Sequence, residues 1–289
     1  MRAMDLNWDD VRVFLGMMRA SSFRDAADKL EMSHPTVRRR LDALEAATGL
    51  ALFHRRSDGL HPTLHGQALF ESAAEVERAM QGLARRARAS DPELRGPVHV
   101  TAPEPVARLL AEDFAAFAAK WPQIELHIAT GTAFADLGAM EADIAIRVLA
   151  EGRKPDENLA GRKALVAHQA VYGDPACGRW IGSQSSRPQS EWVRGTPFPD
   201  LPVRSVIGDP HLRRDAATAG MGIARMPCFM GDPYLPRCSP PLPVFDVWVL
   251  VHPDLRRNPR LKLFRDAMVE AVRRHADLLQ GKTKVALGR

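Results

Sequence analysis

Apolar side chains recur every three or four residues over the first fifty positions, a spacing that buries one face of a helix. Three such stretches follow one another, and each begins at a residue whose side chain can cap a helix, namely Asn7, Ser22 and Ser33. Gly49 then suits the left-handed residue that ends a helix. The expected buried faces are Val11, Phe14, Leu15 and Met18; Ala26, Ala27 and Leu30; and Val37, Leu41 and Leu44. The pattern predicts three short helices that pack together.

The third of these helices has a basic outer face. Pro35 falls in its first turn, where a missing N–H costs nothing, and Arg38, Arg39 and Arg40 follow in a row. A helix with one buried stripe, small polar residues near its start and guanidinium groups outside suits the major groove of DNA. A run of arginines also occurs on ordinary solvated helix faces, so the run alone leaves both interpretations open.

A short strand over residues 50–53 and a hairpin over residues 54–63 are predicted next, because an Asp-Gly turn lies between polar flanks. Arg55 and Arg56 stand on the first flank, where they could contact the phosphate backbone. The alternative is an ordinary surface hairpin. The position directly after a helix-turn-helix pattern favours the wing of a winged helix.

Taken together, these residues resemble the N-terminal domain of LysR-type transcriptional regulators. The resemblance rests on both residue types and spacing in Ser22-Phe23, Ala26-Ala27, Leu30, Ser33 to Val37, Arg39, Leu41, Leu44-Glu45, Gly49-Leu50, Leu52-Phe53, Arg55, Thr63 and Gly66. It implies DNA contacts from Ser33, His34, Pro35, Thr36, Arg38, Arg39, Arg40, Arg55 and Arg56. His34 stands where the family commonly has glutamine, and Arg38 where it commonly has serine, so the operator sequence cannot be borrowed from a relative.

A long helix is expected over residues 66–90. Its apolar positions alternate spacings of three and four, as in the seam of a coiled coil, and are Gly66, Leu69, Ala73, Val76, Met80, Leu83 and Ala87. A helix packed only on its own domain is the alternative. The narrow stripe favours a second copy, and the resemblance implies a linker helix that pairs two subunits. Leu69, Val76, Met80 and Leu83 are the candidate dimer contacts. A homodimer is expected, with a homotetramer left open.

A second domain follows a Pro- and Gly-containing hinge over residues 91–97. Strands are predicted over residues 98–101, 124–129, 143–147, 165–172, 220–224 and 244–251, and helices over residues 106–120, 132–140, 210–219 and 261–275. This alternation predicts a parallel α/β sheet. The tail from residue 281 is expected to be disordered. The predicted divisions are therefore residues 1–65, 66–90, 91–280 and 281–289.

The second domain resembles, more weakly, the effector domain of the same family, with two α/β lobes like those of periplasmic binding proteins and a small ligand between them. Residues 121–126, 142–146 and 219–227 carry this likeness. Thr101, Pro103, Thr132 and Arg147 lie at strand ends and are the candidate contacts for an anionic effector. Each could equally be a turn or capping residue. The short link between Asp174 and Trp180 predicts a second lobe that lacks a helix.

The amino-acid composition does not identify the function, but it argues against several classes of protein. The net charge of +5 favours a polyanionic partner without identifying it. The sequence has no apolar run of membrane-spanning length and no cationic secretory leader, so no membrane partner and a cytoplasmic, nucleoid-associated location are expected. Cys177, Cys228 and Cys238 lack CxxC spacing, and a redox pair of the last two is the minor alternative to buried or incidental thiols.

Catalytic signatures are also missing from the sequence. It contains no GxSxG, HExxH, Walker loop or complete GxGxxG motif. Pro62 separates His61 from His65 and spoils a shared helix face for a metal. We therefore expect no enzyme, cofactor or metal. A DNA-binding regulator is favoured over an α/β ligand-binding protein or enzyme with an incidental helical domain, because a ligand binder does not need the basic helix and the hairpin.

Overall fold

The computed structural model describes residues 6–20, 22–56, 59–90, 92–131, 137, 142–183, 193 and 195–282, with backbone alone at residues 55, 56, 59, 88 and 89. Contacts divide the chain into two units, Met1–Ala84 and Arg85–Arg289. The division falls inside one long helix. Each unit is described by itself.

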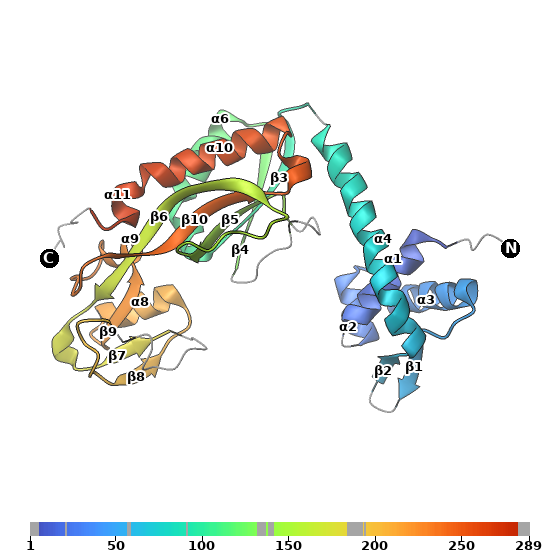
Figure 1. Ribbon diagram of the computed structural model, residues 1–289, viewed down its shortest axis with the longest axis horizontal. Helices are drawn as coiled ribbons and strands as arrows, with labels where there is room; N and C mark the ends of the chain where they lie inside the picture. The colour runs from blue at the N-terminus through green and yellow to red at the C-terminus, as the bar shows by residue number, and fades with distance from the viewer. Residues whose placement is uncertain are drawn as a thin grey trace. The chain divides into compact units, whose positions relative to one another are not determined.

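The first unit contains the expected helices and hairpin (Figure 1). Its elements are α1 (Trp8–Arg19), α2 (Phe23–Lys29), α3 (His34–Thr48), β1 (Phe53–Arg56), β2 (Gly59–Pro62) and α4 (Leu64–Ala89), which continues into the second unit. The three predicted caps are confirmed, because the side chains of Asn7, Ser22 and Ser33 each accept a hydrogen bond from a backbone N–H in the following turn. Gly49 ends α3 with φ of +69°.

The core of this unit is formed by the stripes that the sequence predicted. Val37, Leu41 and Leu44 are buried, and they pack with α1 and with the first turns of α4. The strand expected over residues 50–53 begins only at Phe53. The Leu52 N–H donates to the Glu45 carboxylate of α3 at 2.6 Å, and the ladder of β1 with β2 starts at Phe53, opposite Pro62.

The second unit is built on one eight-stranded sheet with the order β4-β3-β5-β10-β6-β9-β7-β8. The strands are β3 (Gly96–Ala102), β4 (Ile124–Thr130), β5 (Ile144–Ala150), β6 (Ala160–Tyr172), β7 (Trp180–Gly182), β8 (Val203–Val206), β9 (Ile223–Pro227) and β10 (Leu242–Val251). The helices are α5 (Glu104–Leu109), α6 (Ala111–Lys120), α8 (Pro210–Thr218), α9 (Cys228–Gly231), α10 (Pro259–Arg274) and α11 (Ala276–Leu279), with 3-10 turns η1 (Pro175–Cys177) and η2 (Pro253–Leu255).

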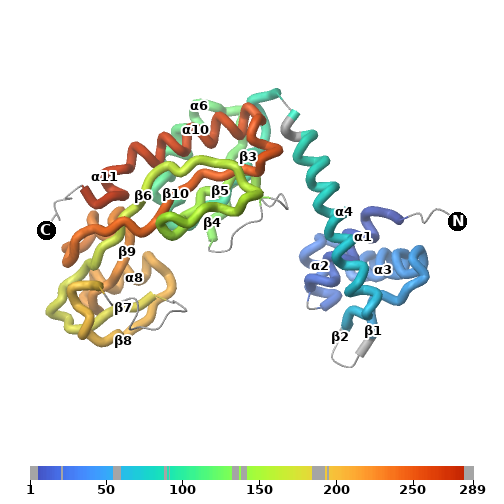
Figure 2. The backbone as a smooth tube through the Cα atoms, in the orientation of Figure 1, coloured from blue at the N-terminus to red at the C-terminus, as the bar shows by residue number. Residues whose placement is uncertain are grey.

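The expectation of a parallel sheet is wrong, because the sheet is mixed. β3 runs parallel to β4 and β5, and β7 runs parallel to β8 and β9, but β10 is antiparallel to both β5 and β6. The physical reason is that one sheet is shared by two lobes. The chain leaves the first lobe along β6 and returns along β10, and two adjacent strands that cross in opposite directions must be antiparallel (Figure 2).

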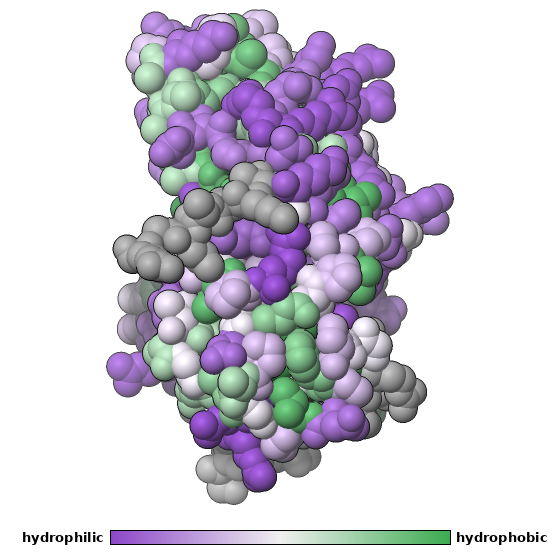
Figure 3. Space-filling view, turned by 90° about the vertical axis from the view of Figure 1, so that its left-hand side faces the viewer, coloured by the Kyte–Doolittle hydropathy of each residue, from purple (hydrophilic) through white to green (hydrophobic). Residues whose placement is uncertain are grey.

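The two expected lobes are present. We call residues 92–168 with 242–282 the first lobe and residues 169–241 the second lobe. The first has a large core in which α6 and α10 pack on the sheet, with Phe114, Phe117 and Phe264 in ring contact. The second has smaller cores on its two sheet faces. Figure 3 shows apolar side chains gathered over the lower part of the molecule, where the second lobe faces the viewer.

Two further expectations about this unit have clear outcomes, and two others fall largely outside the described residues. The single helix expected over residues 106–120 is broken at the fully buried Leu110 into α5 and α6. Only η1 lies between Asp174 and Trp180, as the shortened lobe predicts. The helix expected over residues 132–140 lies outside the described residues except for Leu137, and the tail from residue 281 lies outside them after Lys282.

Candidate nucleic-acid interface and ligand site

The N-terminal half of α3 presents a polar and basic surface. Ser33, His34, Pro35, Arg38 and Arg39 are exposed, on a helix whose opposite side is buried. In the part of the chain that the structure describes, Arg39 makes no hydrogen bond or ion pair, and Arg38 reaches Asp42 only at 3.9 Å. Both guanidinium groups therefore remain available to a polyanion.

Arg40 lies differently from its two neighbours. Its guanidinium is 3.0 Å from Asp10 and 3.1 Å from Asp9, both at the start of α1. These contacts leave only a quarter of its side chain exposed. Although Arg40 belongs to the predicted basic run, its charge is therefore already neutralised within the unit, and its contact is structural.

Three polar residues at the start of α3 are held by local contacts. The His34 ring packs against Phe23 of α2 with centroids 5.1 Å apart, and the hydroxyls of Ser33 and Thr36 are 2.8 Å apart. The rings and hydroxyls are thus oriented before any ligand arrives, which reduces the entropy that binding would cost.

The wing is held to α3 by residues whose role the spacing did not single out. Glu45 accepts from the Leu52 N–H, and the Thr63 hydroxyl donates to the Ala51 carbonyl at 2.7 Å and accepts from the Gly66 N–H at 3.0 Å. β1 and β2 pair antiparallel, with Arg55 opposite Leu60. The side chains of Arg55 and Arg56 lie outside the described residues.

The seam predicted for α4 divides into two parts. Leu69 and Ala73 pack into the core of their own unit, whereas Val76, Met80 and Leu83 are 48%, 40% and 59% exposed. Leu69 is therefore a core residue of its own unit, and the exposed stripe starts at Val76.

The candidate effector residues Thr101 and Arg147 come together in the first lobe. The Arg147 guanidinium donates to the Thr101 hydroxyl at 3.0 Å from the neighbouring strand β5. Arg147 is only 7% exposed, and this burial lowers its pKa. A cation that has lost its water is stabilised by an anion, so the pair suits an anionic group.

Trp248 belongs beside this pair, although the sequence did not point to it. It lies opposite Arg147 in the β5–β10 ladder, and its indole Nε1 is buried without a hydrogen-bond partner in the described structure. Strand periodicity placed Trp248 in β10, but only the pairing of β10 with β5 brings it to Arg147.

The other two candidate effector residues are Pro103 and Thr132. Pro103 precedes α5 and makes no side-chain cap, and Thr132 lies outside the described residues. Next to Pro103, the Glu104 carboxylate bonds Arg108 in the same helix and lies 2.7 Å from His211 at the start of α8. Glu104 and His211 thus occupy the place where the two lobes face one another.

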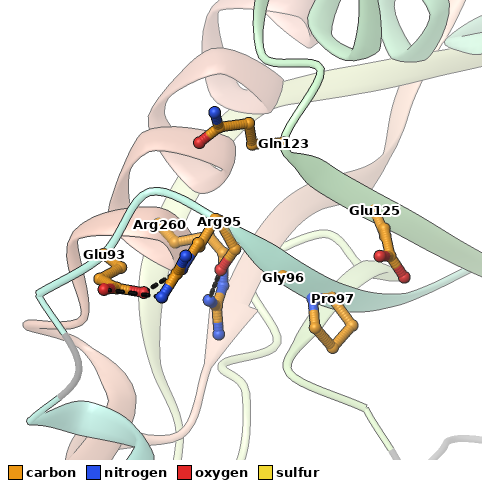
Figure 4. Close-up of a pocket in the computed structure, with 7 residues that line it drawn as sticks. All are labelled: Glu93, Arg95, Gly96, Pro97, Gln123, Glu125 and Arg260. Atoms are coloured by element: carbon orange, nitrogen blue, oxygen red, sulfur yellow. Dashed lines mark hydrogen bonds and ion pairs between the residues drawn. The ribbon is translucent and has the colours of Figure 1, made fainter.

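An open pocket of about 610 Å³ lies elsewhere, where the second unit begins (Figure 4). It is lined by Glu93, Arg95, Gly96, Pro97, Gln123, Glu125 and Arg260. Arg95 pairs with Glu93 in this pocket, and Arg260 donates to the Arg95 main-chain carbonyl. None of the candidate effector residues lines it. We interpret this pocket as a gap in the packing between the start of β3 and α10.

No group of three or more His, Cys, Asp or Glu side chains in the described ranges is placed to hold a metal ion. Among the helices that the structure describes, none combines the length and the apolar character needed to span a bilayer. Cys177, Cys228 and Cys238 are free thiols.

Comparison with known proteins gives two family matches. Residues 8–67 match the model of the bacterial regulatory helix-turn-helix proteins of the lysR family, and residues 92–273 match the LysR substrate binding domain. The second match alone covers more than half of the chain.

Individual relatives agree with these matches. An HTH-type transcriptional regulator of Xanthomonas campestris is 30% identical over 177 residues, which are 60% of this chain and 49% of that protein. The chain thus spans about half the length of the first curated relatives it matches, 49% and 50%. The HTH-type transcriptional activator AmpR of Rhodobacter capsulatus is 29% identical over 80% of this chain and 83% of its own. The solved structure of CrgA, a LysR-type transcriptional regulator from Neisseria meningitidis, has a TM-score of 0.52 at 22% identity and covers 92% of this chain and 99% of its own. This last likeness bears on the fold.

Proposed function

The chain belongs to the LysR family of bacterial helix-turn-helix regulators, and from this premise we propose that it is a homodimeric transcription regulator that binds a double-stranded DNA operator. The observation that carries the proposal is the exposed Arg39 on α3, beside Arg38 and the capped start of the helix. A guanidinium in this place can fork to guanine or clamp a phosphate. Arg55 and Arg56 of the wing would add phosphate contacts, and a tetramer remains an extension of the dimer.

The exposed part of α4 supports the dimer. Val76, Met80 and Leu83 recur at intervals of four and three residues, and their exposure is unusual for three large apolar side chains on one helix. Pairing of two copies along this stripe would bring two α3 helices to two half-sites, and two half-sites specify an operator far better than one.

The effector domain would bind a small anionic molecule at Thr101 and Arg147. A buried guanidinium beside the Thr101 hydroxyl and a nearby indole N–H can receive a carboxylate or phosphate. Pro103 and Thr132 stay as proposed neighbours of this site. Such a ligand would change the relative position of the lobes.

This function places the protein on chromosomal DNA, so we propose a cytoplasmic location with nucleoid association. The alternative, an α/β binding protein or enzyme with an incidental helical domain, is not favoured. Both family matches are to the parts of a regulator, and the named relatives are regulators.

A protection experiment tests the proposal. The purified full-length chain is mixed with fragments of its own genome and an excess of bulk competitor DNA at moderate salt. We expect protection of one or a few short two-fold symmetric sites, because base contacts add affinity beyond the phosphate term. Uniform binding to all fragments, with no protected site, would contradict the proposed function.

A further inference from the structure

Two histidines lie opposite one another at the edge of the large sheet, in the first lobe. β4 is the outermost strand there, and its parallel register with β3 pairs His127 with His99 (Figure 1). The centroids of the two imidazole rings are 4.8 Å apart, and the ring planes are inclined at 34°. The sequence predicted no metal site, because the two residues lie on separate strands and only this register brings their rings together.

We propose that His99 and His127 bind one divalent transition-metal ion of the class of Zn²⁺, Ni²⁺ and Cu²⁺. Neutral imidazole nitrogen is a preferred ligand of these ions, whereas Mg²⁺ and Ca²⁺ prefer oxygen. This inference goes beyond the function proposed above. It does not depend on operator binding, because both residues belong to the first lobe of the effector domain.

The spacing of the two rings suits a shared metal ion. An imidazole nitrogen binds Zn²⁺ at about 2.0–2.1 Å, and two such nitrogens on one tetrahedral ion place their ring centroids roughly 5 Å apart. The observed separation of 4.8 Å is close to this value. Little movement of either strand is therefore required when the ion binds, and the two ligands are brought together before it arrives.

The ring of His99 is oriented by the buried carboxylate of Asp143. This carboxylate accepts from the His99 main-chain N–H at 2.9 Å and lies 3.1 Å from the ring Nδ1. Because a carboxylate can only accept, the neutral ring carries its proton on Nδ1 and its lone pair on Nε2. Histidines that bind metal ions are commonly held by a carboxylate in this way, so Nε2 of His99 is prepared to act as a ligand.

An ion can reach both rings from solvent. The side chains of His99 and His127 are 43% and 55% exposed. Glu125 precedes His127 by two residues in β4, so both side chains lie on one face of the strand, and its carboxylate is 3.7 Å from the Nε2 of His127. Asp143 and Glu125 thus place negative charge beside the pair, which favours a cation there.

Water would complete the coordination of the ion. In the described ranges, the pair has no third His, Cys, Asp or Glu side chain placed to hold the same ion. Structural metal sites generally have four protein ligands, so an ion with two is expected to exchange with solvent as its concentration changes. Its binding would also affect β5, the strand of Arg147, because Asp143 orients His99 and directly precedes this strand.

Calorimetric titration of the full-length chain, without an affinity tag and freed of metal ions by a chelator, tests the proposal. The probes are Zn²⁺, Ni²⁺ and Cu²⁺, with Mg²⁺ as the oxygen-preferring control. We expect Cu²⁺ to bind most tightly and Mg²⁺ not to bind. His99→Gln and His127→Gln should each weaken Cu²⁺ binding at least about tenfold, because even loss of an outer-shell partner costs about that much. His54→Gln is the matched control, since His54 lies opposite His61 in the β1–β2 ladder, and it should leave this binding unchanged.

Each other outcome overturns the proposal. Absence of Cu²⁺ binding removes the site, and Mg²⁺ binding as tight as that of Cu²⁺ assigns the ion to carboxylates. Cu²⁺ binding that either His99→Gln or His127→Gln leaves unchanged shows that the two rings do not share one ion. Binding lost in His54→Gln but kept in His99→Gln assigns the ion to the hairpin. Thermal unfolding checks that each variant folds, which we expect because the replaced rings are half-exposed.

Discussion

Glu104 of α5 and His211 of α8 lie 2.7 Å apart, carboxylate Oε2 to imidazole Nε2, and join the first lobe to the second. Their side chains are 33% and 16% exposed. The two atoms lie within ion-pair distance, and neither ring nitrogen of His211 makes an aligned hydrogen bond in the described structure. It lies beside Pro103, so the chain places its own carboxylate near the expected effector position.

The pair is expected to couple the lobes energetically. In a double-mutant cycle of Glu104→Gln and His211→Gln, we expect an interaction free energy of about 0.5–3 kcal/mol, since contacting residues are not additive. Urea unfolding measures it. Glu112→Gln, in the first turn of the neighbouring helix α6, combined with His211→Gln should be additive. Additivity of the Glu104 pair as well would show that the contact does not hold the lobes.

Arg39 and Arg40 are adjacent but should behave oppositely. Arg39→Ala is expected to weaken operator binding by about 1–3 kcal/mol and leave the thermal midpoint unchanged, because its side chain is exposed. Arg40→Ala should lower the midpoint, because it removes the partner of Asp9 and Asp10. Gel shift and thermal unfolding of both variants measure this. Unchanged operator binding by Arg39→Ala would remove its assigned role.

The exposed stripe of α4 makes a prediction about assembly. Leu83→Asp is expected to weaken the dimer, because a charge in an apolar seam loses its water without a partner. Leu64→Asp is the matched control, since Leu64 is 82% exposed on the same helix but lies off the stripe. Sedimentation velocity measures the dimer fraction. A dimer equally weakened by both changes would argue against the stripe.

Gly66 is required by close packing. A Cβ built at this position would lie 2.3 Å from the Leu52 carbonyl oxygen, which is backbone and cannot rotate away. Gly66→Ala is therefore expected to destabilise the first unit by about 1–3 kcal/mol. Gly131→Ala, where nothing lies within 4 Å, should be nearly neutral. Chemical unfolding followed by circular dichroism compares the two, and equal stability would contradict the predicted clash.

Asp113 should make stability depend on pH in the acid range. Burial raises its pKa, but hydrogen bonds with His275 and with Arg274 at the end of α10 outweigh this, so the pKa falls below the usual 3.8. A carboxyl with a lowered pKa stabilises the fold above its unfolded pKa, and this stabilisation is lost as the pH falls through the folded pKa. Asp113→Asn is expected to cost about 1–3 kcal/mol near pH 6.

The cost of Asp113→Asn should shrink as the pH falls below 3.8. Urea unfolding between pH 7 and pH 3 measures this difference, with Glu112→Gln in the same helix turn as the control. A difference that stays constant across this range would show that folding does not lower the pKa of Asp113.

The local sequence pattern predicted the helices of the first unit well. Asn7, Ser22 and Ser33 cap their helices as expected, because a cap needs only a side chain and the N–H two or three residues later. In the second unit β7 and β8, of three and four residues, were not predicted, but the positions of the other strands were close to those observed. Their directions were not, because antiparallel pairing of β10 with β5 joins segments that lie far apart in the sequence.

By itself, the sequence determined where the first three helices begin, which of their stripes are buried and which helix carries the arginines, since these depend on neighbours within one or two turns. Only the tertiary structure decided that Arg40 faces Asp9 and Asp10 while Arg39 does not, that Trp248 lies beside Arg147, and that Glu104 meets His211. Each of these contacts depends on the register and packing of distant segments, and composition and periodicity carry no information about register across such distances.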